Sequence, residues 1–187
     1  METYIALLRG INVGGNNRVE MPKLKKCFES LGFKSVSTYI NTGNVIFEGK
    51  NKKQEALAAE IEKALGKTFG FEVRVVIRTA KDIRVLSEKM PSAWKNDTDQ
   101  KTDVLFLWDK FDTKATLTQI ATNPDVDRLR YFPGAIIWNV HRADYAKSGM
   151  NKFVGTVVYK HMTARNINTV RKLSQLVAGT KASKIKR

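Results

Sequence analysis

Three short polar segments combine asparagine, threonine or arginine with little aliphatic bulk, and each adjoins a hydrophobic run. They are Arg9–Arg18, Asn41–Asn44 and Thr163–Thr169. Glycine beside a strand gives the backbone access to positive φ, and asparagine stabilises such turns with its own amide. The same amide and guanidinium groups donate hydrogen bonds to anions. We therefore expect the three segments to line one anion-binding cleft.

The third segment carries the strongest case for anion binding. Thr163 is the expected N-cap of the final helix, because its hydroxyl can satisfy amide groups of the first turn. A helix amino terminus that carries an arginine favours an anion, and the Arg165 guanidinium offers two parallel donors. Periodicity places Arg165 on the exposed face, so Arg165→Ala is expected to remove phosphate binding at little cost in stability. The candidate ligand-binding residues are Arg9, Asn12, Gly14, Gly15, Asn41, Asn44, Lys152, Arg165, Asn166 and Asn168.

The glycine-rich first segment does not match either of the common phosphate-binding loops. Its spacing contains neither G-x-G-x-x-G nor Gly-Lys-Ser/Thr. The helix expected from Pro22 starts several residues after Gly15, so its dipole does not point directly at the loop. A nest of backbone amides still suits an anion, whereas the alternative is a turn that only closes the edge of the sheet. Both interpretations stay open.

Metal and catalytic chemistry have few candidate residues. The chain has one cysteine, Cys27, and two isolated histidines, His141 and His161. Zinc needs three or four ligands, and a Ser-His-Asp triad needs a histidine held by a third group. Cys27 lies on the expected buried stripe of the first helix, where a thiol is inert. We expect no metal and no cofactor, and the sequence leaves open whether the protein is an enzyme.

Positive charge is concentrated in the last quarter of the chain. The net charge is +15, and residues 142–187 hold 11 Lys/Arg against Asp144 alone. Such a surplus favours a polyanionic partner, because Lys and Arg neutralise phosphates and release counterions. The alternative is an ordinary soluble basic protein in which residues 181–187 form a frayed tail. Stacking of RNA bases on a sheet is disfavoured, because Tyr4 and Phe47 lie in strands without the alternation of an exposed face.

The first half of the chain has the pattern of a ferredoxin-like, split βαβ arrangement. Tyr4–Leu8 is continuously apolar, which is typical of a strand covered on both faces. Pro22 suits the first turn of a helix, and Gly32 suits its end. The expected order is therefore β-α-β-β-α-β, with strands at 4–8, 36–40, 45–48 and 73–78 and helices from Pro22 to Gly32 and over 51–66, the latter ended by Gly66.

From Thr79 the pattern partly restarts. The expected elements are helices at 81–90, 113–121, from Lys147, and from Thr163 to Gly179, a strand at 103–108, and a hairpin of 128–132 with 135–140 over Pro133-Gly134. We predict an α+β protein of two tandem ferredoxin-like subdomains, residues 1–79 and 80–187, with a C-terminal helix. No apolar stretch approaches the roughly 18 residues of a membrane helix. With one cysteine, the cytoplasm is the expected compartment.

The motifs resemble a known bacterial family. Tyr4–Gly15, Thr38–Phe47 and Thr163–Val170 are similar to motifs of the domain of unknown function 1697, in the same order. The resemblance implies a compact cytosolic α+β protein with a tandem ferredoxin-like arrangement, and it implies no activity. One departure is Ile167, where the family commonly has tryptophan.

Three functional hypotheses follow. The leading hypothesis is a binding protein whose basic C-terminal half engages a phosphate-bearing ligand or a nucleic acid. The second is a metal-independent enzyme that acts on a small phosphorylated or nucleotide-like substrate held by Arg9, Asn12, Asn44, Arg165 and Asn168. The third is a protein-interaction scaffold without a small-molecule site.

Overall fold

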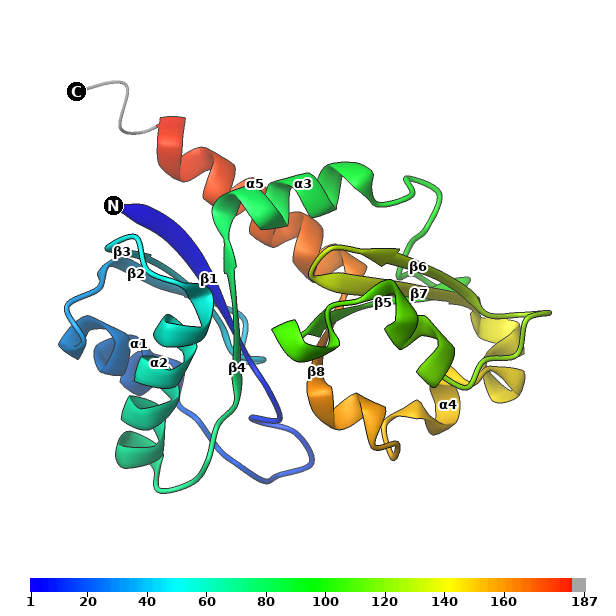
Figure 1. Ribbon diagram of the computed structural model, residues 1–187, viewed down its shortest axis with the longest axis horizontal. Coiled ribbons are helices and arrows are strands. Elements are labelled where there is room, and N and C mark those ends of the chain that lie inside the picture. The colour runs from blue at the N-terminus through cyan, green and yellow to red at the C-terminus, as the bar shows by residue number, and fades with distance from the viewer. Residues whose placement is uncertain (183–187) are drawn as a thin grey trace. The chain divides into compact units, whose positions relative to one another are not determined.

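The chain forms two four-stranded antiparallel sheets with helices packed against them (Figure 1). The computed structural model describes residues 1–182. Contacts divide the chain into two compact units, one of Met1–Arg84 with the chain from Gln175 onward and one of Val85–Ser174. The predicted α+β class is confirmed. Within residues 1–182, each helix is too short or too polar to cross a lipid bilayer.

The first unit has the expected element order β-α-β-β-α-β. Its sheet is ordered β2-β3-β1-β4, and all neighbouring strands are antiparallel. The central strand is buried on both faces from Tyr4 to Leu8, as its continuous apolar run predicts. The elements are β1 (Glu2–Leu8), α1 (Met21–Ser30), β2 (Lys34–Tyr39), β3 (Asn44–Gly49), α2 (Gln54–Phe69) and β4 (Val75–Thr79).

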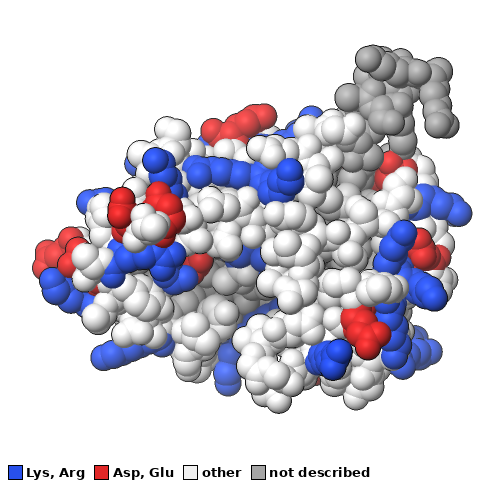
Figure 2. All heavy atoms as spheres, turned by 180° about the vertical axis from the view of Figure 1, so that it is seen from behind, with Lys and Arg blue, Asp and Glu red and all other residues white. Residues whose placement is uncertain are grey.

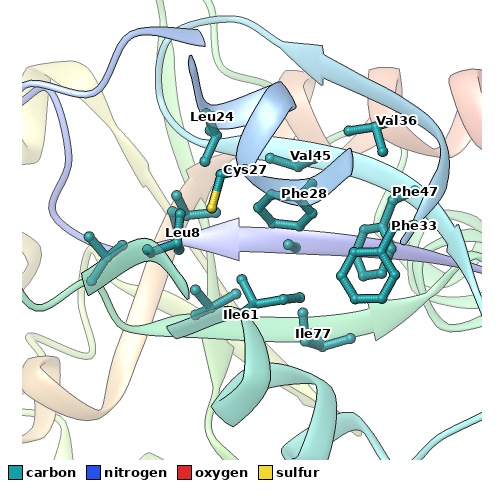
Figure 3. Packing of buried hydrophobic residues seen from close by; sticks show 14 of the residues in the cluster. Leu8, Leu24, Cys27, Phe28, Phe33, Val36, Val45, Phe47, Ile61 and Ile77 are labelled. Atoms are coloured by element: carbon teal, nitrogen blue, oxygen red, sulfur yellow. The ribbon is translucent and has the colours of Figure 1, made fainter. Parts of the chain in front are cut away.

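The core of the first unit lies between the sheet and helices α1 and α2. Figure 3 shows Leu24, Cys27 and Phe28 of α1 pointing toward the sheet. The Phe47 ring of β3 contacts those of Phe28 (5.3 Å between centroids) and Tyr4 (5.6 Å). Because Tyr4 and Phe47 are almost fully buried, neither is available to stack on a base.

The helix ends in the first unit follow glycine geometry, with one correction. Pro22 lies in the first turn of α1, and Gly32 follows that helix with a φ of 82°. The prediction that Gly66 ends α2 is wrong, because the helix continues to Phe69, which packs on the core. Gly70 ends it instead, with φ 79° and its N–H donating to the Gly66 carbonyl at 2.9 Å.

The second unit contains a sheet with the same strand order as the first. Its order is β6-β7-β5-β8, again antiparallel throughout. The strands are β5 (Gln100–Leu107), β6 (Arg128–Phe132), β7 (Ala135–His141) and β8 (Met162–Asn166). Helices α3 (Ala80–Lys89) and α5 (Ile167–Ala182) cross the boundary between the units in sequence.

The connections in the second sheet differ from the expectation. The helix expected at 113–121 is a 3-10 helix, η2 (Lys114–Gln119), and the helix expected from Lys147 is the four-residue α4 (Met150–Phe153). A tandem ferredoxin-like arrangement is therefore not confirmed, because two full crossover helices are absent from this unit. The other short elements are η1 (Asp109–Phe111), η3 (Arg142–Lys147) and η4 (Val158–His161).

The final helix begins later than predicted. Thr163 is not its N-cap, since residues 162–166 form β8 and pair with β5. Asn166 caps α5, because its Oδ1 accepts the Thr169 N–H at 2.9 Å. The helix also passes Gly179, the predicted end, and continues to Ala182. Most of the expected basic tail at 181–187 lies outside the described residues.

Candidate functional site

The glycine-rich segment forms a tight turn that projects from the end of β1. Gly14 and Gly15 occupy its two central positions with φ of 61° and 79°. Asn16 donates its N–H to the Val13 carbonyl at 3.1 Å, and Val13 and Asn16 form a β-bridge. Positive φ at both central residues is the geometry of a type I′ turn, which explains the two consecutive glycines.

Asn12 joins this turn to the second polar segment. Its Nδ2 donates to the carbonyl oxygens of Val19 (2.9 Å) and Asn41 (2.8 Å), and its Oδ1 accepts the Val19 N–H at 2.8 Å. Asn12 has a φ of 53°, a conformation that asparagine tolerates better than most residues. The side-chain amide is thus engaged in positioning the loop.

The Asn41–Asn44 segment packs tightly against the end of β1. A Cβ added to Gly43 would lie 2.8 Å from both Leu8 Cβ and Ile11 Cδ1, and the φ of Gly43 is 78°. Asn44 is fully buried, and its Nδ2 donates to the Tyr39 carbonyl and the Thr42 hydroxyl, both at 3.0 Å. The Asn44 amide therefore stabilises this turn.

The two segments border one open hollow of about 730 Å³ at the start of α1, here called the first-unit hollow. Its polar lining residues are Asn12, Gly15, Asn16, Arg18, Glu20 and Asn41. Three predicted residues of these segments do not line it. Arg9 is half-buried and donates its backbone N–H to the Arg74 carbonyl, Gly14 is exposed, and Asn44 is buried in its turn. The structure thus brings together two of the three predicted segments.

The start of α1 forms part of the wall of the first-unit hollow. Met21 and Pro22 line it together with Gly15. The amino terminus of α1, where the helix dipole is positive, is therefore closer to the glycine-rich loop than the number of residues between them suggested. Glu20 occupies the N-cap position, and its side chain makes no capping hydrogen bond. Pro22 has no N–H, which leaves the Met21 amide as the first donor of the helix.

Arg18 is a lining residue that the sequence did not single out. Its side chain is exposed and forms no ion pair within residues 1–182. A lone surface arginine has no pattern that distinguishes it from other solvated charges, so only the fold of the loop reveals its position. Glu20 also lines the hollow and adds a negative charge to it.

Arg165 is not the exposed helical residue that was predicted. It lies in β8, is 7% exposed, and donates from one guanidinium nitrogen to Thr163 Oγ1 (3.0 Å) and the Ala164 carbonyl (2.7 Å). Burial lowers the pKa of Arg165 to about 10, an effect that the electrostatic influence of Tyr159 partly opposes. The residue remains charged at neutral pH, and its hydrogen bonds go to neighbouring residues of the same strand.

The other predicted residues of the second unit have separate surroundings. Asn166 caps α5, and Asn168 Nδ2 donates to the Asn96 carbonyl at 2.8 Å. Lys152 is exposed on α4. The convergence of this segment with the first-unit hollow stays a prediction. Within residues 1–182, no group of three or more His, Cys, Asp or Glu side chains is placed to hold a metal ion.

Comparison with known proteins identifies the family but no activity. Residues 1–138 match the model of the family described as "Protein of unknown function (DUF1697)". The chain belongs to this family. It is also similar to the solved structure of the conserved bacterial protein SP0830 from Streptococcus pneumoniae, with 28% identity and a TM-score of 0.80 over 94% of this chain and 98% of that one. No curated protein matches the sequence.

This DUF1697 chain has one further polar cluster, which holds the loops of the second unit together. Buried Asp127 accepts hydrogen bonds from Ser148 Oγ, from Trp138 Nε1 (2.9 Å) and from the Gly149 N–H (2.9 Å). Burial by itself raises the pKa of Asp127, but these donors and the Asn123 N–H outweigh it and lower the pKa. No sequence pattern pointed to this cluster, because its members are far apart in the chain.

Proposed function

We propose that this protein binds a small phosphate-bearing ligand in the first-unit hollow. The observation that carries the proposal is the hollow itself, where the Gly14-Gly15 turn, the Asn41–Asn44 turn and the start of α1 meet. Its volume of about 730 Å³ is in the range of roughly 300–1,000 Å³ that is typical of small-molecule sites. A sugar phosphate or a nucleotide is of suitable size.

The residues that line the hollow supply donors for an anion. Arg18 supplies a guanidinium, Asn16 a side-chain amide, and Met21 the first backbone N–H of α1. A helix amino terminus and an arginine together favour phosphate by dipole and by bidentate hydrogen bonding. Glu20 limits the negative charge that the site accepts, or it orients a hydroxyl of the ligand by accepting its hydrogen bond.

Several C-terminal basic residues are engaged within the protein, which disfavours nucleic acid as the ligand. Arg171 donates to the Pro91 and Trp94 carbonyls, Arg142 to the Asp97 carbonyl, and Lys147 pairs with Asp144 at 3.1 Å. Arg165 is buried. On the face drawn in Figure 2, Lys and Arg lie in separate groups with Asp and Glu among them. A long phosphate backbone would require a continuous basic track.

The proposal is tested by thermal unfolding of the full chain with inorganic phosphate, pyrophosphate, sugar phosphates, nucleotides and oligonucleotides. A ligand that binds only the native state stabilises it by about 2.7 kcal/mol at a hundred times its Kd. We expect a saturable shift for a small phosphate compound, which Arg18→Gln removes. Arg128→Gln, at an exposed arginine of β6, is the matched control and should retain the shift.

Two results would contradict the proposal. One is an equal shift in both variants that grows steadily with salt, since this indicates general ionic stabilisation. The other is binding of oligonucleotides without binding of any small phosphate compound, which would favour nucleic-acid binding by the basic C-terminal residues.

A further inference from the structure

The second unit contains a small pocket on the face of β5 that packs against Trp138 and Phe153, here called the β5 pocket. Lys101, Asp103 and Leu105 point to it from alternate positions of the strand. Much of the remaining wall is aromatic, because the Phe153 ring packs edge-on against both Trp138 (5.2 Å) and Tyr159 (5.4 Å). The pocket is thus an apolar recess in the core with one polar side.

The size of the β5 pocket indicates what can enter it. Its volume is about 80 Å³. That is the space of a few water molecules at about 30 Å³ each, and well below the roughly 300 Å³ at which sites for free metabolites begin. The pocket therefore suits one aliphatic side chain of a larger partner.

The polar side of the β5 pocket is already satisfied. Lys101 Nζ lies 2.7 Å from Asp103 Oδ2, and both side chains are largely shielded from solvent. The same ammonium group also lies 5.9 Å from the centre of the Tyr145 ring. Because the Lys101 ammonium and the Asp103 carboxylate neutralise each other, the pocket does not require a charged group in its occupant.

The segment beside the β5 pocket exposes apolar and basic side chains together. Val154 lines the pocket and is 67% exposed, and Val157, in the same loop, is 70% exposed. Residues 147–160 contain three lysines and no acidic residue. Lys152 and Lys160 are exposed, and neither forms an ion pair within the described part of the chain. This charge is complementary to an acidic partner.

We propose that the β5 pocket and its rim bind an acidic peptide segment of a partner protein, with one aliphatic side chain inserted into the pocket. The inserted side chain is a buried anchor of the kind that dominates the energy of an interface. The carboxylates of the segment lie against Lys152 and Lys160, which speed association and make it sensitive to salt. This interaction is independent of the phosphate site, because it uses only residues of the second unit.

Fluorescence anisotropy with labelled acidic peptides tests the proposal on the full chain. The two peptides differ only in a central leucine or alanine. We expect the leucine peptide to bind about tenfold more tightly, as is typical for the loss of a buried aliphatic anchor. Filling the pocket by Ala164→Leu, or placing a charge at its rim by Val154→Asp, should weaken the leucine peptide by a similar factor.

A charge-reversal pair separates the contribution of the lysines. The double variant Lys152→Glu with Lys160→Glu should weaken binding about tenfold, whereas Lys172→Glu, at an exposed position of α5, should change it less than about twofold. Equal affinity for the leucine and alanine peptides, or the absence of binding at low salt, would overturn the proposal. So would binding of anionic phosphatidylserine vesicles in place of the peptide, since that would assign the exposed valines to a membrane surface.

Discussion

The side-chain amide of Asn12 donates to the backbone carbonyl of Asn41 across 2.8 Å, and so joins two turns that are 29 residues apart in the sequence. The same side chain also donates to the Val19 carbonyl and accepts the Val19 N–H. One asparagine thereby sets the position of the loop that carries Arg18. The relationship explains why both segments are rich in asparagine, although Asn12 itself has no donor left for a ligand.

We predict that Asn12→Asp destabilises the protein by about 1–3 kcal/mol, because a carboxylate would face the carbonyls of Val19 and Asn41 in place of a donor. Urea unfolding measures the change. Asn16→Ala, in the same loop, removes an exposed side chain and should stay within about 0.5 kcal/mol of the natural protein. Equal stability of Asn12→Asp and the natural protein would show that the Asn12 side chain does not form these hydrogen bonds to the Val19 and Asn41 carbonyls.

Two glycines of the first unit should respond differently to substitution. Gly43→Ala should lower the free energy of unfolding by several kcal/mol, on the order of 2–4, because the added methyl group would overlap Leu8 and Ile11 at a positive φ. Gly15→Asn should cost at most about 1 kcal/mol, since its φ of 79° is tolerated by asparagine and no atom lies within 4 Å of an added Cβ. Similar losses in both variants would contradict the described packing of Gly43.

Arg165→Ala should destabilise the protein by about 2–3 kcal/mol, because it empties a buried site and removes hydrogen bonds to Thr163 and Ala164. Arg128→Ala, at an exposed arginine of the same sheet, should change stability by less than about 0.5 kcal/mol. Denaturant midpoints compare the two. If Arg165→Ala were as stable as Arg128→Ala, the guanidinium would be solvated and not buried.

Asp127 should contribute to the pH dependence of stability. Its pKa in the folded protein lies below the ordinary value of 3.8, so its stabilising effect is complete above that pH and disappears as the pH falls through the lowered pKa. Asp127→Asn should therefore cost about 1.5–3 kcal/mol near neutral pH, and the difference from the natural protein should shrink below pH 3.8. A difference that is constant with pH would indicate that the carboxylate is not charged in the fold.

Much of the fold was predictable because its evidence is local. Pro22 and Gly32 mark the two ends of α1, and Pro133-Gly134 marks the β6–β7 turn. The end of α2 was predicted wrongly at Gly66. The packing of Phe69 on the core, three residues later, stabilises the helix enough to continue it through a glycine. The role of Thr163 as an N-cap was predicted wrongly because a threonine before a polar segment fits an N-cap and a strand equally well. Its pairing with β5 places it in a strand.

The candidate site was less predictable than the fold. The turn-forming residues were recognised from glycine and asparagine, which have conformational reasons to occur where they do. Arg18 gave no such evidence, because an exposed charge is compatible with any surface position. Arg165 was assigned to an exposed face only because its element was mistaken for a helix. Local residue types thus located the loops, whereas the tertiary structure determined which side chains point into the hollow.

The most direct test of phosphate binding is an amide NMR titration of the full chain with pyrophosphate. We predict saturable shifts concentrated at Gly15, Asn16 and Met21, on the wall of the first-unit hollow, and their loss in Arg18→Gln. Shifts confined to the second unit, or an unchanged spectrum up to millimolar pyrophosphate, a concentration that corresponds to only about 4 kcal/mol of binding, would contradict it.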